Sequence, residues 1–441
     1  MRHPMLLAPL LALALTTCTE ERRPNLLFLS VDTLRADHLG TYGHERPTSP
    51  ALDALCAEAV VFESAHSSSS WTLPSFASAM TGLPTSSHGC WNFKSRLAPS
   101  FTTLAETLQH AGYHTAAVVS HTFLGSRYGL HQGFADYDES LVAATRPISH
   151  EAITAPNISD RALALLDAQA ASDQPWFIWL HYFDPHRSYR FHDGVSEQFD
   201  GPTEELEYED PRQQALYEGE IAFTDKHIGR VLDRLEALGL ADDTVVVLFA
   251  DHGEEFQEHQ RLGHGKTLYR EVERIPLAVR APGIAPMRVD TPVSVIDVMP
   301  TVLELLGVPS APSGGAARSL APLMLGRSLP PRGCLLELRL RQRKVDAEAF
   351  VFGRWKLIEE RPLDPSVPPS TLLFDILADP DEQHDVATEK PDVVAQMQAR
   401  MQLALAQARG AAQSSVGEVD LSAEDLDQLR ALGYLSNDDQ H

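Results

Sequence analysis

Short apolar runs alternate with amphipathic segments along most of the chain. Runs of strand length lie at 26–31, 60–62, 115–119, 176–180, 244–250 and 275–280. Helical periodicity marks 51–59, 104–111, 160–169, 213–238 and 297–306. Strands that are apolar throughout are typical of a sheet buried on both faces, and their alternation with helices favours parallel pairing. The pattern therefore predicts an α/β fold with a doubly wound, mostly parallel sheet flanked by helices.

The remaining third of the chain predicts a smaller C-terminal α+β unit. Strand-like runs lie at 349–359 and 372–376, and helical periodicity marks 391–408 and 423–432. Residues 307–318 are rich in Pro, Ser, Gly and Ala, as expected for a junction, and 413–418 has the composition of a linker. We expect a main domain over 24–306, a linker over 307–318, a sheet-plus-helix subdomain over 319–412 and a tail with one short helix over 413–441.

Residues 1–19 have the pattern of an export signal. Basic residues precede the apolar run Met5–Leu15, which is too short to span a bilayer. The sequence Leu15-Thr16-Thr17-Cys18 resembles a bacterial lipobox, in which Cys18 would carry a lipid anchor. The protein is therefore expected to be periplasmic or an outer-membrane-anchored lipoprotein, with plain cleavage and secretion as the alternative. The other cysteines have no metal-site spacing and are expected to be buried apolar residues: Cys56, Cys90 and Cys334.

The charge of the chain limits its partners. The formal net charge is −25, with 36 Lys and Arg against 61 Asp and Glu. Phosphate backbones are bound by clustered basic side chains, so the balance argues against a nucleic-acid partner. An anionic substrate would have to be held by a local site, because the overall field repels it.

The stretch Ser67–Gly82 is the first candidate for chemistry. A run of four serines leads to Thr72 and Pro74, followed by small and apolar residues at helical spacing. Proline is favoured in the first turn of a helix and threonine just before it, so Thr72 is expected at a helix N-terminus, where the dipole favours an anion. Its hydroxyl could be a nucleophile if a metal or base activates it, or only a helix cap.

Three polar groups follow apolar strands of the predicted sheet. Asp32 follows the first strand, His181 to His186 follow the fourth, and Asp251-His252 follow the fifth. In open α/β sheets ligands bind outside the carboxyl ends of the strands. An aspartate after a strand is often only a turn residue, but three such groups are expected to converge at one edge.

A set of motifs then makes the chain similar to the sulfatase family, within the alkaline-phosphatase-like superfamily of metal-dependent ester hydrolases. The motifs are PNLLFLSVDTLRADHLG (24–40), TLPS (72–75), AGYHTAAVV (111–119), HYFDPH (181–186), ADHGEEF (250–256), GHGKTLYREVERIPL (263–277), IDVMPT (296–301), and the weaker WKLI and LFDILADPDE within 355–382. Together they cover nearly the whole chain after residue 23. The resemblance implies a doubly wound sheet with a divalent cation at its carboxyl edge and a small C-terminal sheet domain.

The resemblance also implies roles for individual residues. Asp32, Asp251 and His252 would bind the metal, with Thr72 as a further ligand and nucleophile. His186 would contact a substrate oxygen or protonate the leaving group, and His264 would take the place of a sulfate-binding lysine. Second choices for substrate contacts, for which a solvated surface position is the alternative, are His181, His259 and Lys266. A hydroxyl made nucleophilic by a cation is the chemistry expected of this set.

The chain departs from the family pattern at the position of the formylglycine residue. Sulfatases form this aldehyde from Cys or Ser within a Cys-x-Pro-x-Arg signature, whereas the corresponding residues here are Thr72, Pro74 and Phe76. Threonine cannot be converted to the aldehyde, so direct attack by Thr72 is the remaining route.

The expected metal and anion sites differ as well. Asp32-Thr33 replaces an Asp pair and His252 replaces an Asn, which favours zinc, iron or manganese over calcium as the one divalent ion. The usual Lys-x-His pair is replaced by Ser120 and Thr122, with His121 between them as a candidate substrate contact.

Two functions fit these residues. The first is a metal-dependent hydrolase of sulfate, phosphate or phosphonate esters, which acts on a small anionic substrate through Thr72. The second is a non-catalytic, metal-containing binding lipoprotein that keeps the fold.

Overall fold

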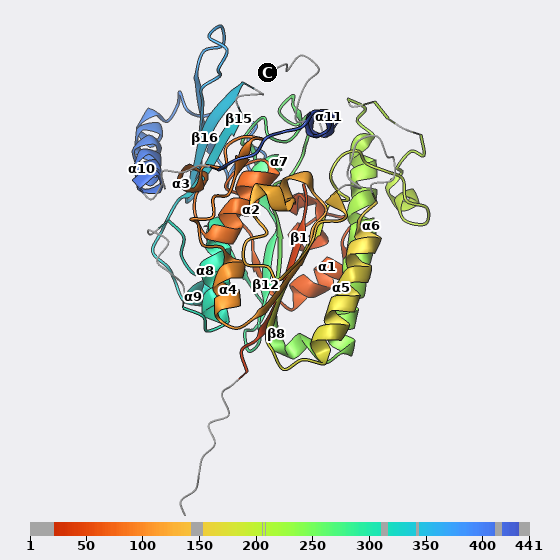
Figure 1. Cartoon of the computed structure of the whole chain (residues 1–441). Coiled ribbons are helices and arrows are strands. Elements are labelled where there is room, and N and C mark those ends of the chain that lie inside the picture. Colours follow the sequence, from red (N-terminus) through yellow and green to blue (C-terminus); the bar gives the residue numbers. More distant parts are fainter. Residues whose placement is uncertain are drawn as a thin grey trace, which may run out of the picture.

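A sheet of eight strands forms the centre of the molecule (Figure 1). The computed structural model describes residues 22–142, 153–204, 206–207, 209–309, 316–340, 344–410 and 417–431. In spatial order the strands are β13 (Met287–Val289), β2 (Val60–Phe62), β12 (Leu277–Arg280), β8 (Thr244–Ala250), β1 (Asn25–Val31), β7 (Trp176–Tyr182), β5 (His114–Val118) and β6 (Asp136–Asp138). Only β12 runs antiparallel to its neighbours in this sheet. The predicted doubly wound, mostly parallel sheet is confirmed.

Helices cover both faces of this sheet (Figure 1). On one face lie α1 (Pro50–Ala57), α5 (Ala155–Ala170) and α6 (Gln213–Ala237), and on the other α2 (Thr72–Thr81), α4 (Leu104–His110) and α8 (Val298–Leu305). Short helices are α3 (Thr85–His88), α7 (Arg270–Glu273) and α9 (Ala321–Met324). The central strands β1, β7 and β8 are buried along their whole length, as their apolar sequences require. Helix α5 begins five residues before the predicted start.

A second, four-stranded antiparallel sheet forms the C-terminal unit. Its strands are β15 (Cys334–Leu340), β16 (Val345–Phe352), β17 (Trp355–Glu360) and β18 (Ser370–Asp375), and α10 (Pro391–Gly410) packs on it. The single strand predicted over 349–359 is wrong, because the chain turns back at Gly353, where φ is +61°. Apolar residues continue on both sides of that turn, so periodicity alone did not reveal it.

One buried ion-pair cluster connects this sheet to the main domain. The Lys356 ammonium on β17 lies 2.8 Å from Glu273 of α7 and 2.8 Å from Glu382, and all three side chains are almost fully buried. At this depth water cannot solvate the Lys356 ammonium in place of its two carboxylate partners. Each buried charge is therefore stabilised by the others.

Other differences from the predicted elements occur at short strands. The run 275–280 is interrupted at Pro276, which separates β11 (Arg274–Ile275) from β12. β11 joins β3 (Ala65–His66) and β14 (Val293–Ser294) in a small sheet, and β9 (Glu255–Phe256) pairs with β10 (Leu262–Gly263). The expected linker 413–418 ends in β19 (Gly417–Glu418), which pairs with β4 (Ser95–Arg96) before α11 (Ala423–Ala431).

The cysteines that the structure describes are free and buried, as predicted: Cys56, Cys90 and Cys334. Within the described ranges, no helix is both long enough and apolar enough to cross a bilayer. The export signal and the lipid anchor at Cys18 fall outside these ranges and stay predictions.

Candidate active site

The polar residues that follow the three central strands emerge side by side. β1 pairs in parallel with β7 and with β8, and Val31 lies opposite both Tyr182 and Ala250. The residue after Val31 is Asp32, and the residue after Ala250 is Asp251, so the register places these two carboxylates together. The convergence expected from the sequence is therefore a direct result of strand register.

Asp32, Asp251 and His252 form a compact group of potential metal ligands. One donor atom from each lies within 4.8 Å of the others, and all three side chains are completely buried. The His252 Nε2 atom is 3.3 Å from Asp251 Oδ2 and 3.9 Å from Asp32 Oδ1. The His252 Nδ1–H donates to the Gly253 carbonyl at 2.9 Å, which leaves the lone pair of Nε2 directed at the two carboxylates.

Most oxygens of these two carboxylates lack a hydrogen-bond donor and a balancing positive charge. Among the residues that the structure describes, neither oxygen of Asp32 nor Oδ2 of Asp251 has a hydrogen-bond partner. Burial, and then the charges of Asp251 and Glu254, raise the pKa of Asp32 well above its ordinary value. Burial also raises the pKa of Asp251 to about 7. Bare buried carboxylate oxygens beside an imidazole lone pair fit a divalent cation, which would supply the missing charge.

Thr72 lies against this group at the start of α2. Its Oγ1 atom is 3.3 Å from His252 Nε2, and its hydroxyl also bonds to Asp251. The helix begins at Thr72 itself, with Trp71 as the flanking residue, so the prediction that Thr72 precedes the helix is wrong by one position. The consequence for chemistry is small, because Thr72 still lies in the first turn of a ten-residue helix, where the dipole favours an anion.

The serine run fixes the backbone that leads to Thr72. The Ser67 hydroxyl bonds to the Asp251 carbonyl and lies 2.9 Å from the Ser75 hydroxyl, while the Ser70 hydroxyl donates to Thr267 O at 2.7 Å. Hydroxyl side chains that bond to backbone groups stabilise an irregular buried segment without adding charge. The run is thus a structural support for Thr72.

Four further histidines surround the carboxylates. His181 Nε2 is 3.4 Å from Asp32 Oδ2, and His121 Nε2 is 3.9 Å from the same atom. The His186 ring centroid lies 5.5 Å from that of His121 and 5.0 Å from that of His264. Burial lowers the pKa of His181 to about 3 and that of His186 to about 4, so these imidazoles are neutral at pH 7. His181 is fully buried, so the alternative of a solvated surface position is wrong for this residue.

Backbone and carboxylate groups orient two of these rings. The His186 Nδ1–H donates to Arg187 O at 2.7 Å, and His264 Nδ1 donates to Glu254 Oε1 at 3.0 Å. The other Glu254 oxygen accepts from the Tyr189 hydroxyl at 3.0 Å. Glu254 therefore holds His264 in place.

The other second-choice residues make contacts outside the cluster. The Lys266 ammonium donates to Leu262 O at 2.7 Å. The His259 ring stacks on Tyr269 with centroids 3.8 Å apart and pairs with Glu271. Two neighbouring glutamates are also used elsewhere: Glu255 accepts from Thr267, and Glu258 pairs with Arg35.

Two residues of the site were not found from the sequence. Ser30 lies 3.1 Å from His181 Nδ1, and the Tyr217 hydroxyl donates to Thr33 O at 2.7 Å. Ser30 is the single polar residue within the apolar run 26–31, and that break in the run is the signal that could have been used. Tyr217 gives no such signal, because it reaches the loop after β1 from a helix nearly two hundred residues away.

Sequence comparison relates the chain to known proteins over most of its length. The model of the Sulfatase family matches residues 24–308. An Escherichia coli (strain K12) protein named uncharacterized sulfatase YidJ is 26% identical over 420 residues, which is 83% of this chain and 83% of that protein. Arylsulfatase K of Bos taurus is 24% identical over 443 residues, 86% of this chain and 81% of the bovine protein.

Solved structures share the fold at lower identity. The yidJ protein of Bacteroides fragilis has a TM-score of 0.74 at 20% identity, covering 89% of this chain and 98% of the other. A phosphonate monoester hydrolase of Agrobacterium radiobacter has a TM-score of 0.72 at 19% identity, covering 88% and 96%. A protein solved in complex with D-glucosamine-2-N,6-O-disulfate has a TM-score of 0.71 at 19% identity, covering 88% and 98%.

Proposed function

Because the chain belongs to the sulfatase family, we propose that it is a metal-dependent hydrolase of sulfate or phosphate and phosphonate esters that uses Thr72 as its nucleophile. One observation carries the proposal. The Thr72 hydroxyl lies within 3.3 Å of the His252 lone pair and bonds to Asp251, beside the bare oxygens of Asp32. A hydroxyl in these surroundings is close to a proton acceptor and to a position for a cation.

Asp32, Asp251, His252 and Thr72 are the residues that would hold one divalent cation. A bound cation would lower the pKa of the Thr72 hydroxyl and neutralise charge on the anionic ester. Two carboxylates with one imidazole suit manganese or zinc better than the all-oxygen coordination preferred by calcium.

Each step of the reaction can be assigned to a residue of this chain. Thr72 Oγ attacks the sulfur or phosphorus atom, its proton passes to Asp251, and the bond to the ester oxygen breaks. His186 or His264 would deliver a proton to the departing oxygen. Because the His186 ring is neutral at pH 7 and its one N–H is donated to Arg187 O, that proton must first be taken up from water at Nε2. Water later hydrolyses the bond between Oγ and the central atom. Their rings are 5.0 Å apart and both face the cluster, so either can reach the same leaving group. His121 and His181 would contact the anionic oxygens.

The substrate class follows from the site and the relatives together. Sulfatase names among the relatives favour a sulfate ester, and the phosphonate monoester hydrolase among the similar structures favours a phosphorus ester. The complex with a disulfated glucosamine supports a small anionic sugar ester as one candidate. The absence of the Cys-x-Pro-x-Arg signature from the sequence favours the phosphorus esters, because direct attack by a hydroxyl needs no aldehyde.

The test is a matched assay of the purified protein loaded separately with manganese, zinc and calcium. Aryl sulfate, phosphate monoester, phosphodiester and phosphonate monoester would be compared for wild type, Thr72→Ser, Thr72→Ala and Thr81→Ala. Thr81 is the control, because it lies on the same helix and its hydroxyl only donates to Ala77 O. We expect Thr72→Ser to retain turnover and Thr72→Ala to lose it by a factor on the order of 10⁴.

Equal rates for Thr72→Ala and Thr81→Ala would exclude Thr72 as the nucleophile. No turnover of any ester by a metal-loaded wild type would favour the non-catalytic binding protein instead. Turnover of the sulfate ester alone would assign the substrate class and leave Thr72 to be judged by its variants.

A further inference from the structure

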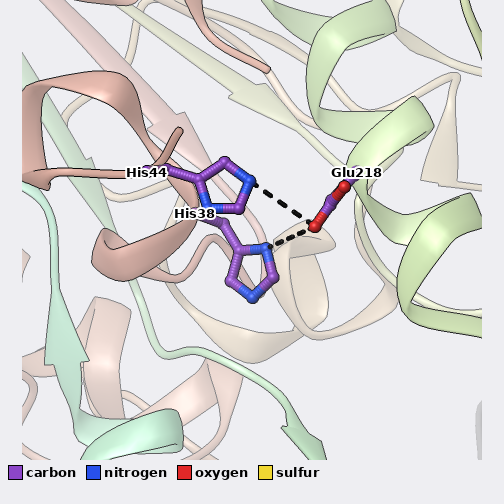
Figure 2. Close-up of side chains that lie close together, drawn as sticks. All are labelled: His38, His44 and Glu218. Carbon is purple, nitrogen blue, oxygen red and sulfur yellow. Dashed lines mark ion pairs between the residues drawn. The ribbon is translucent and has the colours of Figure 1, made fainter. Parts of the chain in front are cut away.

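A second group of imidazole and carboxylate ligands shares no residue with the candidate active site (Figure 2). It consists of His38 in the short turn after β1, His44 a few residues later, and Glu218 on α6. His38 Nδ1 lies 3.6 Å from Glu218 Oε1, and His44 Nε2 lies 3.5 Å from the same oxygen. Two rings thus direct one nitrogen each at a single carboxylate oxygen.

The local backbone brings the two histidines together. Residues Ala36–His38 and Gly40–Tyr42 form successive 3₁₀ turns, and Gly43 then reverses the chain with φ at +100°. This positive φ is readily adopted by glycine and strained for most other residues. As a result the His44 ring lies over the His38 ring, with centroids 5.0 Å apart.

The contacts within this cluster are not ordinary hydrogen bonds. Both distances to Glu218 exceed the usual range for a hydrogen bond between nitrogen and oxygen. In the described part of the chain, His38 Nδ1 and His44 Nε2 have no hydrogen-bond partner, and the His38 residue is only 3% exposed. A buried nitrogen aimed at a carboxylate without bonding to it leaves room for an atom between them.

The spacing suits a transition metal ion. Ligands at about 2.0–2.1 Å from a tetrahedral zinc ion are separated from one another by about 3.3 Å. The two nitrogen-to-oxygen distances found here are within a few tenths of an ångström of that value, and the three ligand atoms all lie within 4.8 Å of one another. Two imidazoles with one carboxylate are a common ligand set for zinc and other first-row divalent ions. Arg46 Nη1 lies 2.7 Å from Glu218 Oε2, so it holds the carboxylate by its other oxygen and leaves Oε1 facing the rings.

A third cluster of similar composition differs in the charge of its ring. In the group of Glu255, His259 and Glu271, His259 Nδ1 lies 3.3 Å from Glu271 and its Nε2 lies 3.1 Å from the Glu382 carbonyl. Burial lowers the pKa of His259, but Glu271 and the Glu382 carbonyl outweigh it and raise that pKa above its ordinary value. A protonated imidazole has no lone pair for a metal.

We propose that His38 Nδ1, His44 Nε2 and Glu218 Oε1 bind a first-row divalent transition-metal ion of the zinc class, distinct from the ion of the candidate active site. The His44 side chain is 17% exposed, so an ion can enter from solvent and complete its coordination with water. The ion would fasten the turns after β1 to α6. The residue before Glu218 is Tyr217, whose hydroxyl accepts from Arg35 N and donates to Thr33 O, so the same helix also fixes the backbone next to Asp32.

Metal content measured on protein produced without a polyhistidine tag tests this site. Wild type, His44→Ala, Glu218→Gln, Asp251→Asn and the double variant His44→Ala/Asp251→Asn would be loaded with zinc, freed of excess metal and analysed for zinc per chain. His384→Ala is the control, because that side chain is 82% exposed and pairs only with a neighbouring aspartate. Circular dichroism of each variant verifies that the chain is folded.

We expect about two zinc ions per chain in wild type and in His384→Ala, and about one in each single variant of a ligand. The double variant should retain almost none. Cobalt loading gives an independent readout, since His44→Ala should remove one set of visible absorption bands and Asp251→Asn another. Zinc content in folded His44→Ala and Glu218→Gln equal to that of the control would overturn the proposal, whatever the activity of Thr72 variants.

Discussion

Glu337 joins the C-terminal sheet to the segment that leads into Thr72, and its replacement by glutamine tests the charge state of that junction. The Glu337 backbone N–H on β15 donates to Ser68 O at 2.9 Å, and its carboxylate accepts from Ser86 N at 2.9 Å. The residue is 1% exposed. Burial, the largest cause, raises the pKa of this carboxyl from 4.5 to about 7.

The magnitude follows from that pKa. Each pKa unit corresponds to about 1.4 kcal/mol, so ionising Glu337 in the folded state costs about 3 kcal/mol more than in the unfolded chain. Between these two pKa values the folded state binds more protons than the unfolded state, and the free energy of unfolding therefore falls as pH rises. Most of this loss, about 2.5 kcal/mol, is expected between about pH 5 and about pH 8. In Glu337→Gln this contribution is absent, because the amide does not titrate and can still accept from Ser86.

Urea unfolding of both proteins at the two pH values measures the effect. Other titrating groups cancel when the change in wild type is compared with the change in Glu337→Gln. Glu58→Gln is the control, since that side chain is 68% exposed and its replacement should leave the pH dependence unaltered. If wild type and Glu337→Gln lose equal stability between about pH 5 and about pH 8, Glu337 is not the neutral buried carboxyl inferred here.

Three further predictions concern the fold and the metal. Lys356→Met leaves two buried glutamates without their cation and should lower the free energy of unfolding by about 3–5 kcal/mol, whereas Arg354→Met, which breaks an exposed pair, should cost less than about 1 kcal/mol in the same urea titration. Gly253→Ala would place a Cβ atom 2.0 Å from a backbone carbonyl oxygen and displace the Gly253 carbonyl, which accepts the hydrogen bond from the His252 ring. The zinc affinity measured by calorimetry should therefore fall about 10–100-fold, whereas that of Gly410→Ala should be unchanged. Removing metal with a chelator should lower the melting temperature reversibly, because the two active-site aspartates then share a buried site without a cation; an unaltered melting curve would contradict the metal assignment.

The sequence by itself determined the class of fold, because the apolar runs are long and uninterrupted in the strands that form the middle of the sheet. It also determined which polar residues meet, since parallel strands end at one edge and Asp32 and Asp251 directly follow two of them. Where strands are short or carry a turn inside an apolar run, as at Gly353 and Pro276, periodicity gave the wrong boundaries.

Only the tertiary structure decided which side chains support these residues. Tyr217 and Glu254 act through contacts with Thr33 and His264, and the meeting of His38 and His44 with Glu218 depends on how α6 packs against the turns after β1. Such contacts join residues far apart in the chain, and they depend on angles and distances that no local pattern records. Burial is equally a property of the whole fold, and it is burial that raises the pKa of both carboxylates of this site.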